Sequence, residues 1–133
     1  LSVSQGQPIT IQAILGQDGR VTLCEPLDYP DFIWAMNRCD LILSDSGGVQ
    51  EEAAGLKKPL LVMRNISERP EAMEQGTAEL VGTSRERIRE AALAILSDES
   101  YRERLLNRGA NPFGDGSASK RIVQGIRRYY ERR

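Results

Sequence analysis

The sequence contains no histidine, and this absence excludes several kinds of active site. Histidine is the usual general acid or base near neutral pH and the commonest transition-metal ligand in proteins. Ser-His-Asp and Cys-His catalysis within this chain are therefore excluded, as is a zinc site that includes histidine. We expect neither a metal ion nor a cofactor.

Cysteines and long apolar runs are also scarce. The only two cysteines, Cys24 and Cys39, have apolar neighbours, and we interpret them as buried free thiols in a reducing, cytoplasmic compartment. No apolar run approaches the ~18 residues of a membrane-spanning helix. Eighteen basic residues against nineteen acidic ones give a net charge of −1, so we expect no binding to nucleic acid or to a membrane.

The length and the residue types that are present indicate one globular domain over residues 1–133. The chain is 40% hydrophobic and 28% charged, which is typical of folded proteins and argues against disorder. It starts at Leu1 with no signal-peptide pattern. Together with the lack of histidine, this start leads us to expect a fragment of a larger protein.

Short apolar runs recur about every twenty residues, and segments with helical spacing lie between them. Several runs are apolar on successive residues, which is typical of strands buried on both faces of a parallel sheet. The alternation predicts an α/β fold, a Rossmann-like parallel sheet flanked by helices. The expected strands are Val21–Cys24, Leu41–Ser44, Leu60–Met63 and Ala78–Val81, and the expected helices between them are Pro30–Arg38, Val49–Leu56 and Glu71–Gln75.

The two ends of the chain are predicted to be helical. Thr83 and Glu86 have the spacing of a capping box, and Asp98 can cap the next helix. A last helix lies within residues 117–133, and we expect its apolar side chains, Ile122, Ile126 and Tyr129, to point inward. Within the first twenty residues, Ile9, Ile11, Ala13 and Leu15 alternate like a strand. Ile11, Ile14 and Leu15 also fit a helix, with Pro8 near its first turn and Gly16 at its end, and we favour the helix.

The most informative stretch is the run Ser46-Gly47-Gly48, between an apolar strand and a helix. Ligands of open α/β sheets bind beyond the carboxyl ends of the strands. Glycines let a ligand approach the backbone, and a helix N-terminus attracts phosphate. Glu52, one turn later, can accept hydrogen bonds from a ribose diol, so phosphate and ribose together indicate a nucleotide. A tight turn with a solvated glutamate is the alternative, and the missing Walker lysine and dinucleotide fingerprint argue against ATP and NAD.

Two further candidates follow neighbouring strands. Arg69, next to Pro70, can present a forked cation to an anion, although a salt bridge within the loop is the simpler interpretation. Phe32 follows the first expected strand and could stack on a base, or could belong to the core.

Together these stretches resemble the C-terminal domain of the non-hydrolysing UDP-N-acetylglucosamine 2-epimerases. The resemblance runs from about Val21 to Tyr130, while residues 1–20 match poorly. It rests on the segments LSDSGGVQEE at 43–52, SERPEA at 67–72, LVGT at 80–83 and NPFGDG at 111–116. Asn65 and Ser67 depart from the family pattern, which commonly has aspartate and threonine there.

The resemblance implies one half of a glycosyltransferase-B-like enzyme of polysaccharide biosynthesis. Such enzymes interconvert UDP-GlcNAc and UDP-ManNAc by eliminating UDP and adding it back. It implies that Ser46, Gly47 and Gly48 hold the diphosphate, that Glu52 holds the ribose, and that Phe32 and Arg69 lie near the same UDP. The implied partners are UDP or UDP-N-acetylglucosamine and the missing N-terminal domain.

The resemblance places the catalytic carboxylates and a histidine motif outside this chain, so we assign no catalytic residue here and expect the fragment alone to be inactive. Three alternatives stay open. They are a non-catalytic nucleotide-sugar-binding module, the donor-binding domain of a glycosyltransferase-B-type transferase, and self-association of the chain as a homodimer.

Overall fold

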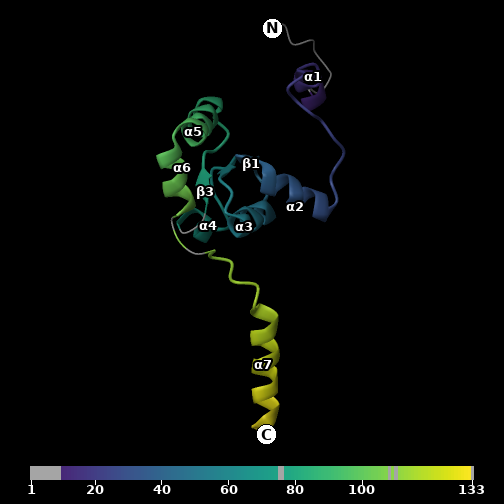
Figure 1. Ribbon diagram of the computed structural model, residues 1–133, viewed down its shortest axis with the longest axis vertical. Coiled ribbons are helices and arrows are strands. Elements are labelled where there is room, and N and C mark those ends of the chain that lie inside the picture. Colours follow the sequence, from purple (N-terminus) through teal and green to yellow (C-terminus); the bar gives the residue numbers. More distant parts are fainter. Residues whose placement is uncertain (1–9, 75–76, 108, 110, 133) are drawn as a thin grey trace. The chain divides into compact units, whose positions relative to one another are not determined.

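The computed structural model describes residues 10–74, 77–107, 109 and 111–132. The chain divides into two compact units, Leu1–Phe32 and Ile33–Arg133. Ten secondary-structure elements lie in the described residues, and Figure 1 labels most of them.

The first unit contains the short helix α1, Ile11–Leu15. The hydroxyl of Thr10 accepts a hydrogen bond from the N–H of Ala13, which caps the helix at its start, and Gly16 ends it. The helix expected around Ile11 and Leu15 is thus confirmed over the alternative strand. Pro8 and Ile9, which entered that expectation, lie outside the described residues.

The strand expected at Val21–Cys24 is wrong, because these residues form no regular secondary structure. A strand must pair with a neighbour, and none lies among the described residues of this unit. The expectation that both cysteines are buried is also wrong. Cys24 is exposed, since its segment packs into no sheet, and Cys39 is half-buried with its Sγ 3.1 Å from the carbonyl oxygen of Met36.

Helix α2, Tyr29–Arg38, begins within a residue of the expected helix and ends where it was expected to end. Its apolar face carries Met36, which is 4% exposed, whereas Trp34 on the other side lies in solvent with the guanidinium of Arg38 5.0 Å from its ring centre.

The second unit is built on a parallel sheet of three strands, β1 (Ile42–Ser44), β2 (Leu60–Val62) and β3 (Ala78–Leu80), in the order β1-β2-β3. Ile42 pairs with Leu60, and Leu60 pairs with Ala78. All three residues of β2 are fully buried, as a central strand covered on both faces requires. The predicted α/β class and parallel sheet are therefore confirmed.

Helices cover both faces of this sheet. Figure 1 shows the sheet between α3 (Gly47–Leu56) and the pair α5 (Arg85–Ser97) and α6 (Glu99–Leu106). Alternate residues of a strand point to opposite faces of a sheet. The side chain of Leu61 therefore points to one face, and those of its two neighbours on β2 point to the other. On the side of α5 and α6 the core consists of Leu61, Val81, Ile95 and Leu105.

The starts of α5 and α6 test the capping predictions. Asp98 caps α6 by accepting from the N–H of Tyr101, as expected. The capping box at Thr83 is wrong, because α5 begins one residue later and its cap is Ser84, which accepts from the N–H of Arg87. Gly82 explains the shift: its φ of +69° puts a turn at Gly82 and Thr83 before the helix can start.

Helix α7, Ala118–Glu131, ends the described chain. Its apolar residues were expected to point inward, but Ile122, Ile126 and Tyr129 are 61%, 53% and 56% exposed. Nothing in the described part of the chain covers this stripe. No helix among the residues that the structure describes is long and apolar enough to cross a membrane.

Candidate functional site

Two loops leave the sheet at the same edge. Because β1 and β2 are parallel neighbours, the segment after Ser44 and the segment after Val62 both start at the carboxyl edge of the sheet. This is the edge at which open α/β sheets bind their ligands. The first loop leads into α3, and the second leads into the short helix α4, Pro70–Glu74.

The first loop is a tight turn that leaves the start of α3 accessible. The hydroxyl of Ser44 accepts a hydrogen bond from the N–H of Ser46 at 3.1 Å, which holds the turn. Ser46 has extended backbone angles at the N-cap of α3, yet its hydroxyl makes no capping hydrogen bond. The hydroxyl of Ser46, which is exposed, therefore does not satisfy the first N–H groups of α3.

The two glycines that follow keep this helix start open. Among the atoms of the described residues, a Cβ placed on Gly47 would meet none within 4 Å, and one on Gly48 would meet only the Oγ of Ser46, at 4.0 Å. Neither glycine has a positive φ, so neither is required by the backbone conformation. Their small size instead leaves space for a group that approaches the backbone, as an anion does at a helix N-terminus.

The second loop contributes a cation that is tied to α3. The Nε of Arg69 donates to Oε1 of Glu51 at 2.7 Å, and an Nη of Arg69 lies 3.3 Å from the carbonyl oxygen of Glu68. The hydrogen bond to Glu51 and then its negative charge raise the pKa of the Arg69 guanidinium. Arg69 thus stays charged at physiological pH, and its side chain is 40% exposed at the carboxyl edge.

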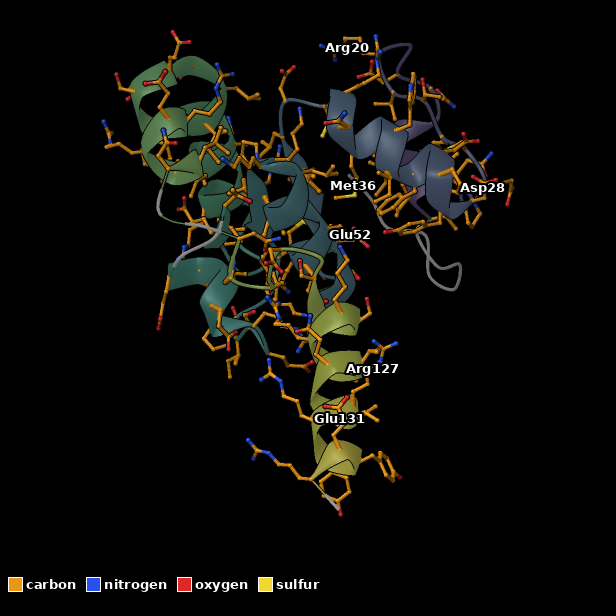
Figure 2. All side chains as sticks on the ribbon, turned by 60° about the horizontal axis from the view of Figure 1, so that its bottom comes forward. Arg20, Asp28, Met36, Glu52, Arg127 and Glu131 are labelled. Carbon is orange, nitrogen blue, oxygen red and sulfur yellow. The ribbon has the colours of Figure 1, made fainter. Side chains whose placement is uncertain are left out.

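Glu52 lies on α3 next to Glu51 and is half-buried. Figure 2 labels its side chain on the ribbon of this helix. It comes one turn after Gly48, about 6 Å further along the helix axis.

Sequence analysis missed the residue that connects the two loops. Gln50 is 1% exposed, accepts a hydrogen bond from the hydroxyl of Ser67 at 2.7 Å and donates one to the carbonyl oxygen of Ser46 at 3.4 Å. Glu51, the partner of Arg69, was also missed. The contact between Gln50 and Ser67 spans seventeen residues of sequence, and the contact between Glu51 and Arg69 spans eighteen. No local spacing could therefore have indicated them.

A third loop packs against the second. A Cβ on Gly82, just after β3, would lie 2.8 Å from Oδ1 of Asn65. Its positive φ favours glycine at this position, whereas the contact with Asn65 could be relieved by a shift of that exposed side chain. Asn65, one of the departures from the family pattern, thus lies next to the turn that follows β3.

Five of the six predicted site residues lie in the second unit. Ser46, Gly47 and Gly48 share one turn, Glu52 follows on the same helix, and Arg69 is joined to that helix through Glu51. Phe32 lies on α2 as the last residue of the first unit and is half-buried. Its place beside a base stays a prediction.

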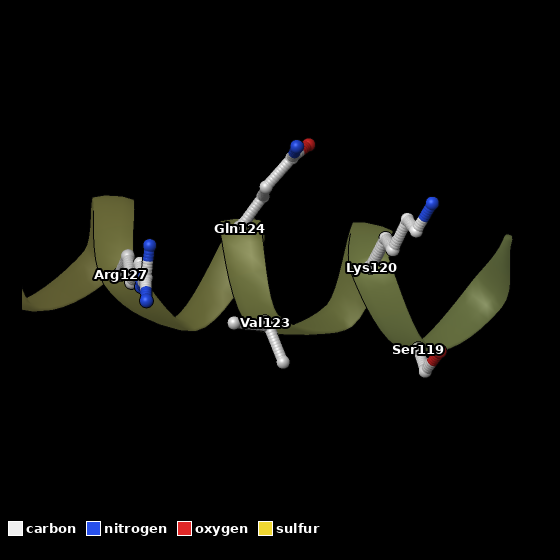
Figure 3. A pocket seen from close by; sticks show the side chains of 5 residues that line it. All are labelled: Ser119, Lys120, Val123, Gln124 and Arg127. Atoms are coloured by element: carbon white, nitrogen blue, oxygen red, sulfur yellow. The ribbon is translucent and has the colours of Figure 1, made fainter.

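A second surface hollow lies on α7 and differs from the candidate site at the carboxyl edge. It is lined by Ser119, Lys120, Val123, Gln124 and Arg127. Figure 3 shows that all five side chains come from one helix, with Gln124 and Val123 pointing to different sides. Because no second element among the described residues lines it, this hollow differs from the carboxyl edge, where two loops meet.

Comparisons with known proteins agree with the motifs. A probable UDP-N-acetylglucosamine 2-epimerase of Ralstonia solanacearum is 51% identical over 110 residues, which are 83% of this chain and 29% of that protein. The structure of the UDP-GlcNAc 2-epimerase of Neisseria meningitidis, bound to UDP-GlcNAc, superposes with a TM-score of 0.82 at 43% identity over 89% of this chain and 32% of that one. A structure of S. aureus MnaA with UDP gives a TM-score of 0.80 at 43% identity over 90% and 32% of the two chains.

The chain thus spans 29% of the length of the Ralstonia relative. The sequence profile of the family described as UDP-N-acetylglucosamine 2-epimerase matches residues 4–127. Since that match covers nearly all of the sequence, the chain belongs to the UDP-N-acetylglucosamine 2-epimerase family, as its motifs predicted.

Proposed function

We propose that this chain is the UDP-binding part of a non-hydrolysing UDP-N-acetylglucosamine 2-epimerase. The observation that carries the proposal is the turn at Ser46 and Gly47, at the carboxyl end of β1, whose helix start is open to an approaching group. The similar Neisseria and S. aureus structures, which hold UDP-GlcNAc and UDP, support this ligand.

Each part of the nucleotide has a matching group in the proposed site. The N–H groups at the start of α3 and the hydroxyl of Ser46 donate to the diphosphate, and Arg69 offsets its charge. The carboxylate of Glu52 accepts from the ribose hydroxyls. Phe32, the last residue of the first unit, carries the aromatic side chain that the resemblance assigns to the uracil.

The proposal divides the reaction between this chain and the rest of the parent protein. The epimerisation by elimination and re-addition of UDP needs groups that take and give protons at the sugar. This chain has no histidine and spans about a third of the solved relatives, so the proposal assigns those groups to the remaining length. The chain alone is then a UDP binder without turnover. Both cysteines are free, which suits the cytoplasm as the proposed compartment.

Titration calorimetry of the chain with UDP, uridine and ADP tests the proposal. UDP should bind, uridine should bind less tightly because it lacks the diphosphate, and ADP should bind less tightly because its base differs. Ser46→Ala should weaken UDP by about tenfold, since a hydrogen bond to a charged group is lost, and should leave uridine unchanged. Equal affinity for UDP and uridine, or no heat with UDP, would contradict the proposal.

A further inference from the structure

Gln50 makes the buried contact between the two loops of the candidate site. It lies at the fourth position of α3 and is 1% exposed. A buried carboxamide costs free energy unless its donor and its acceptor are both used. Both are used here: Nε2 donates to the carbonyl oxygen of Ser46 at 3.4 Å, and Oε1 accepts from the Ser67 hydroxyl at 2.7 Å.

Ser67 extends this connection to Arg69. Its Oγ accepts a hydrogen bond from the backbone N–H of Arg69 at 3.0 Å while its own proton goes to Gln50. A hydroxyl has one proton, so these two bonds fix the direction of the series. The side chain of Arg69 then returns to α3 at Glu51, the neighbour of Gln50. The loop is thereby attached to α3 at two consecutive residues.

We propose that Gln50 is a positioning residue for the diphosphate, because it holds the turn at Ser46 and, through Ser67, the backbone of Arg69 in one arrangement. This inference rests on the proposed function, since the diphosphate is the ligand that the two loops would share. Gln50 acts through Ser46 and Arg69 and does not itself touch the nucleotide.

The chemistry of the position requires glutamine. A glutamate would place a second acceptor against the carbonyl oxygen of Ser46, and its charge would oppose an anion at the start of α3. A methionine of similar size would satisfy neither Ser46 nor Ser67. At the other end of the contact, threonine keeps the hydroxyl that serine provides, whereas alanine removes it.

A double-mutant cycle on UDP affinity tests the proposal in the 133-residue chain. Gln50→Met and Ser67→Ala should each weaken UDP binding about tenfold. The double variant should be no weaker than either single variant, because both remove the same connection. Ser67→Thr should keep the affinity of the unmodified chain. Ser97→Ala is the matched control, because its hydroxyl donates to the carbonyl oxygen of Leu93 at 2.6 Å within α5 and joins no loops.

Amide hydrogen exchange without UDP gives a second readout. If Gln50 made only local contacts, its substitution would not change the exchange rate at Arg69. Gln50→Met should speed exchange at the N–H of Arg69, which bonds to Ser67 and not to Gln50. Unchanged exchange there, additive losses of affinity, or full affinity in a folded Ser67→Ala variant would overturn the proposal. If Gln50→Met does not fold, the comparison of Ser67→Ala with Ser67→Thr still decides it.

The two proposals fail in different ways. If the unmodified chain binds no UDP, the proposed function falls, and with it the role of Gln50 toward diphosphate. If the unmodified chain binds UDP and the variants at Gln50 and Ser67 bind it equally well, only the positioning role falls.

Discussion

The Nε of Arg69 lies 2.7 Å from Oε1 of Glu51, and this ion pair joins the loop after β2 to the helix after β1. The two side chains are 40% and 43% exposed, so water screens the pair and its effect on stability is small. Its consequence is geometric, because the Nε of Arg69 is held at Glu51, in the second turn of α3. In the proposed function, an anion bound at the start of this helix would meet an oriented cation.

Glu51 variants separate this orientation from the charge of the pair. Glu51→Ala frees the Nε of Arg69 and should weaken UDP binding about threefold, with little change in the thermal midpoint. Glu51→Gln keeps an acceptor for Arg69 and removes a negative charge near the phosphates, so its affinity should be unchanged or higher. Titration calorimetry on both variants checks this. Equal losses in the two variants would show that orientation is not what Glu51 provides.

Gly47→Ala should weaken UDP binding while it stabilises the folded chain. Gly47 has no positive φ, and a Cβ there would meet no atom of the described part of the chain within 4 Å. The substitution should therefore stabilise the chain by about 0.5 kcal/mol through the lower entropy of the unfolded state. The same Cβ would occupy the space through which a phosphate reaches the backbone, so UDP should bind at least about tenfold more weakly.

Gly55→Ala is the matched control for Gly47→Ala on the same helix. A Cβ on Gly55 would lie 3.7 Å from Nδ2 of Asn111, which is ordinary van der Waals contact far along α3 from Ser46. It should raise stability in urea unfolding and leave UDP affinity unchanged. If Gly47→Ala also leaves the affinity unchanged, no phosphate sits at this helix start.

Glu52 is predicted to recognise the ribose hydroxyls of UDP. The unmodified chain should bind UDP more tightly than 2′-deoxy-UDP, because one hydroxyl bonded to the carboxylate is missing in the analogue. Glu52→Ala should weaken UDP by about tenfold and abolish this difference, since neither nucleotide then meets an acceptor. A preference for UDP that persists in Glu52→Ala would assign the ribose to another residue.

The parts of the fold that depend on local pattern were predictable. The successive apolar residues of Leu60–Val62 indicated a strand covered on both faces, and Asp98 indicated a helix start, because both signals come from neighbours in sequence. The segment 21–24 has a similar apolar pattern, yet it forms no strand. Segment 21–24 is also largely exposed, with Leu23 at 45%. An apolar run therefore specifies neither burial nor a strand by itself, because both need a partner element that the local pattern does not contain.

The candidate site was predictable only in its nucleotide-facing residues. Ser46 and Gly47 are recognisable because a helix start with glycines has its own sequence pattern. Gln50 and Glu51 were missed, because their contacts with Ser67 and Arg69 form only when β1 and β2 bring the two loops together. Likewise, Ile122 was expected to be buried from its helical spacing, but such spacing shows that a stripe exists and not what covers it.

Asp115, in the turn before α7, should titrate below its ordinary pKa. The backbone N–H of Ser117 donates to its carboxylate at 2.9 Å, and the guanidinium of Arg121 donates to both oxygens, at 3.0 and 3.2 Å. The N–H of Ser117 and then Arg121 lower the pKa of Asp115 below 3.8. Because the folded state holds this carboxylate ionised, the contacts are complete above the ordinary pKa and are lost as pH falls through the lowered one.

Arg121→Gln tests whether the N–H of Ser117 lowers the pKa of Asp115 more than Arg121 does. The substitution removes one of the two donors, so the pKa of Asp115 should rise toward 3.8 but stay below it, because the N–H of Ser117, the larger cause, remains. An NMR titration of the Asp115 side-chain carbon in both chains measures the change. Asp18, whose pKa is lowered mainly by its hydrogen bond to the side chain of Arg20, is the internal control and should titrate alike in both. A pKa of Asp115 that reaches the ordinary value in Arg121→Gln would show that Arg121, and not the turn backbone, holds the carboxylate ionised.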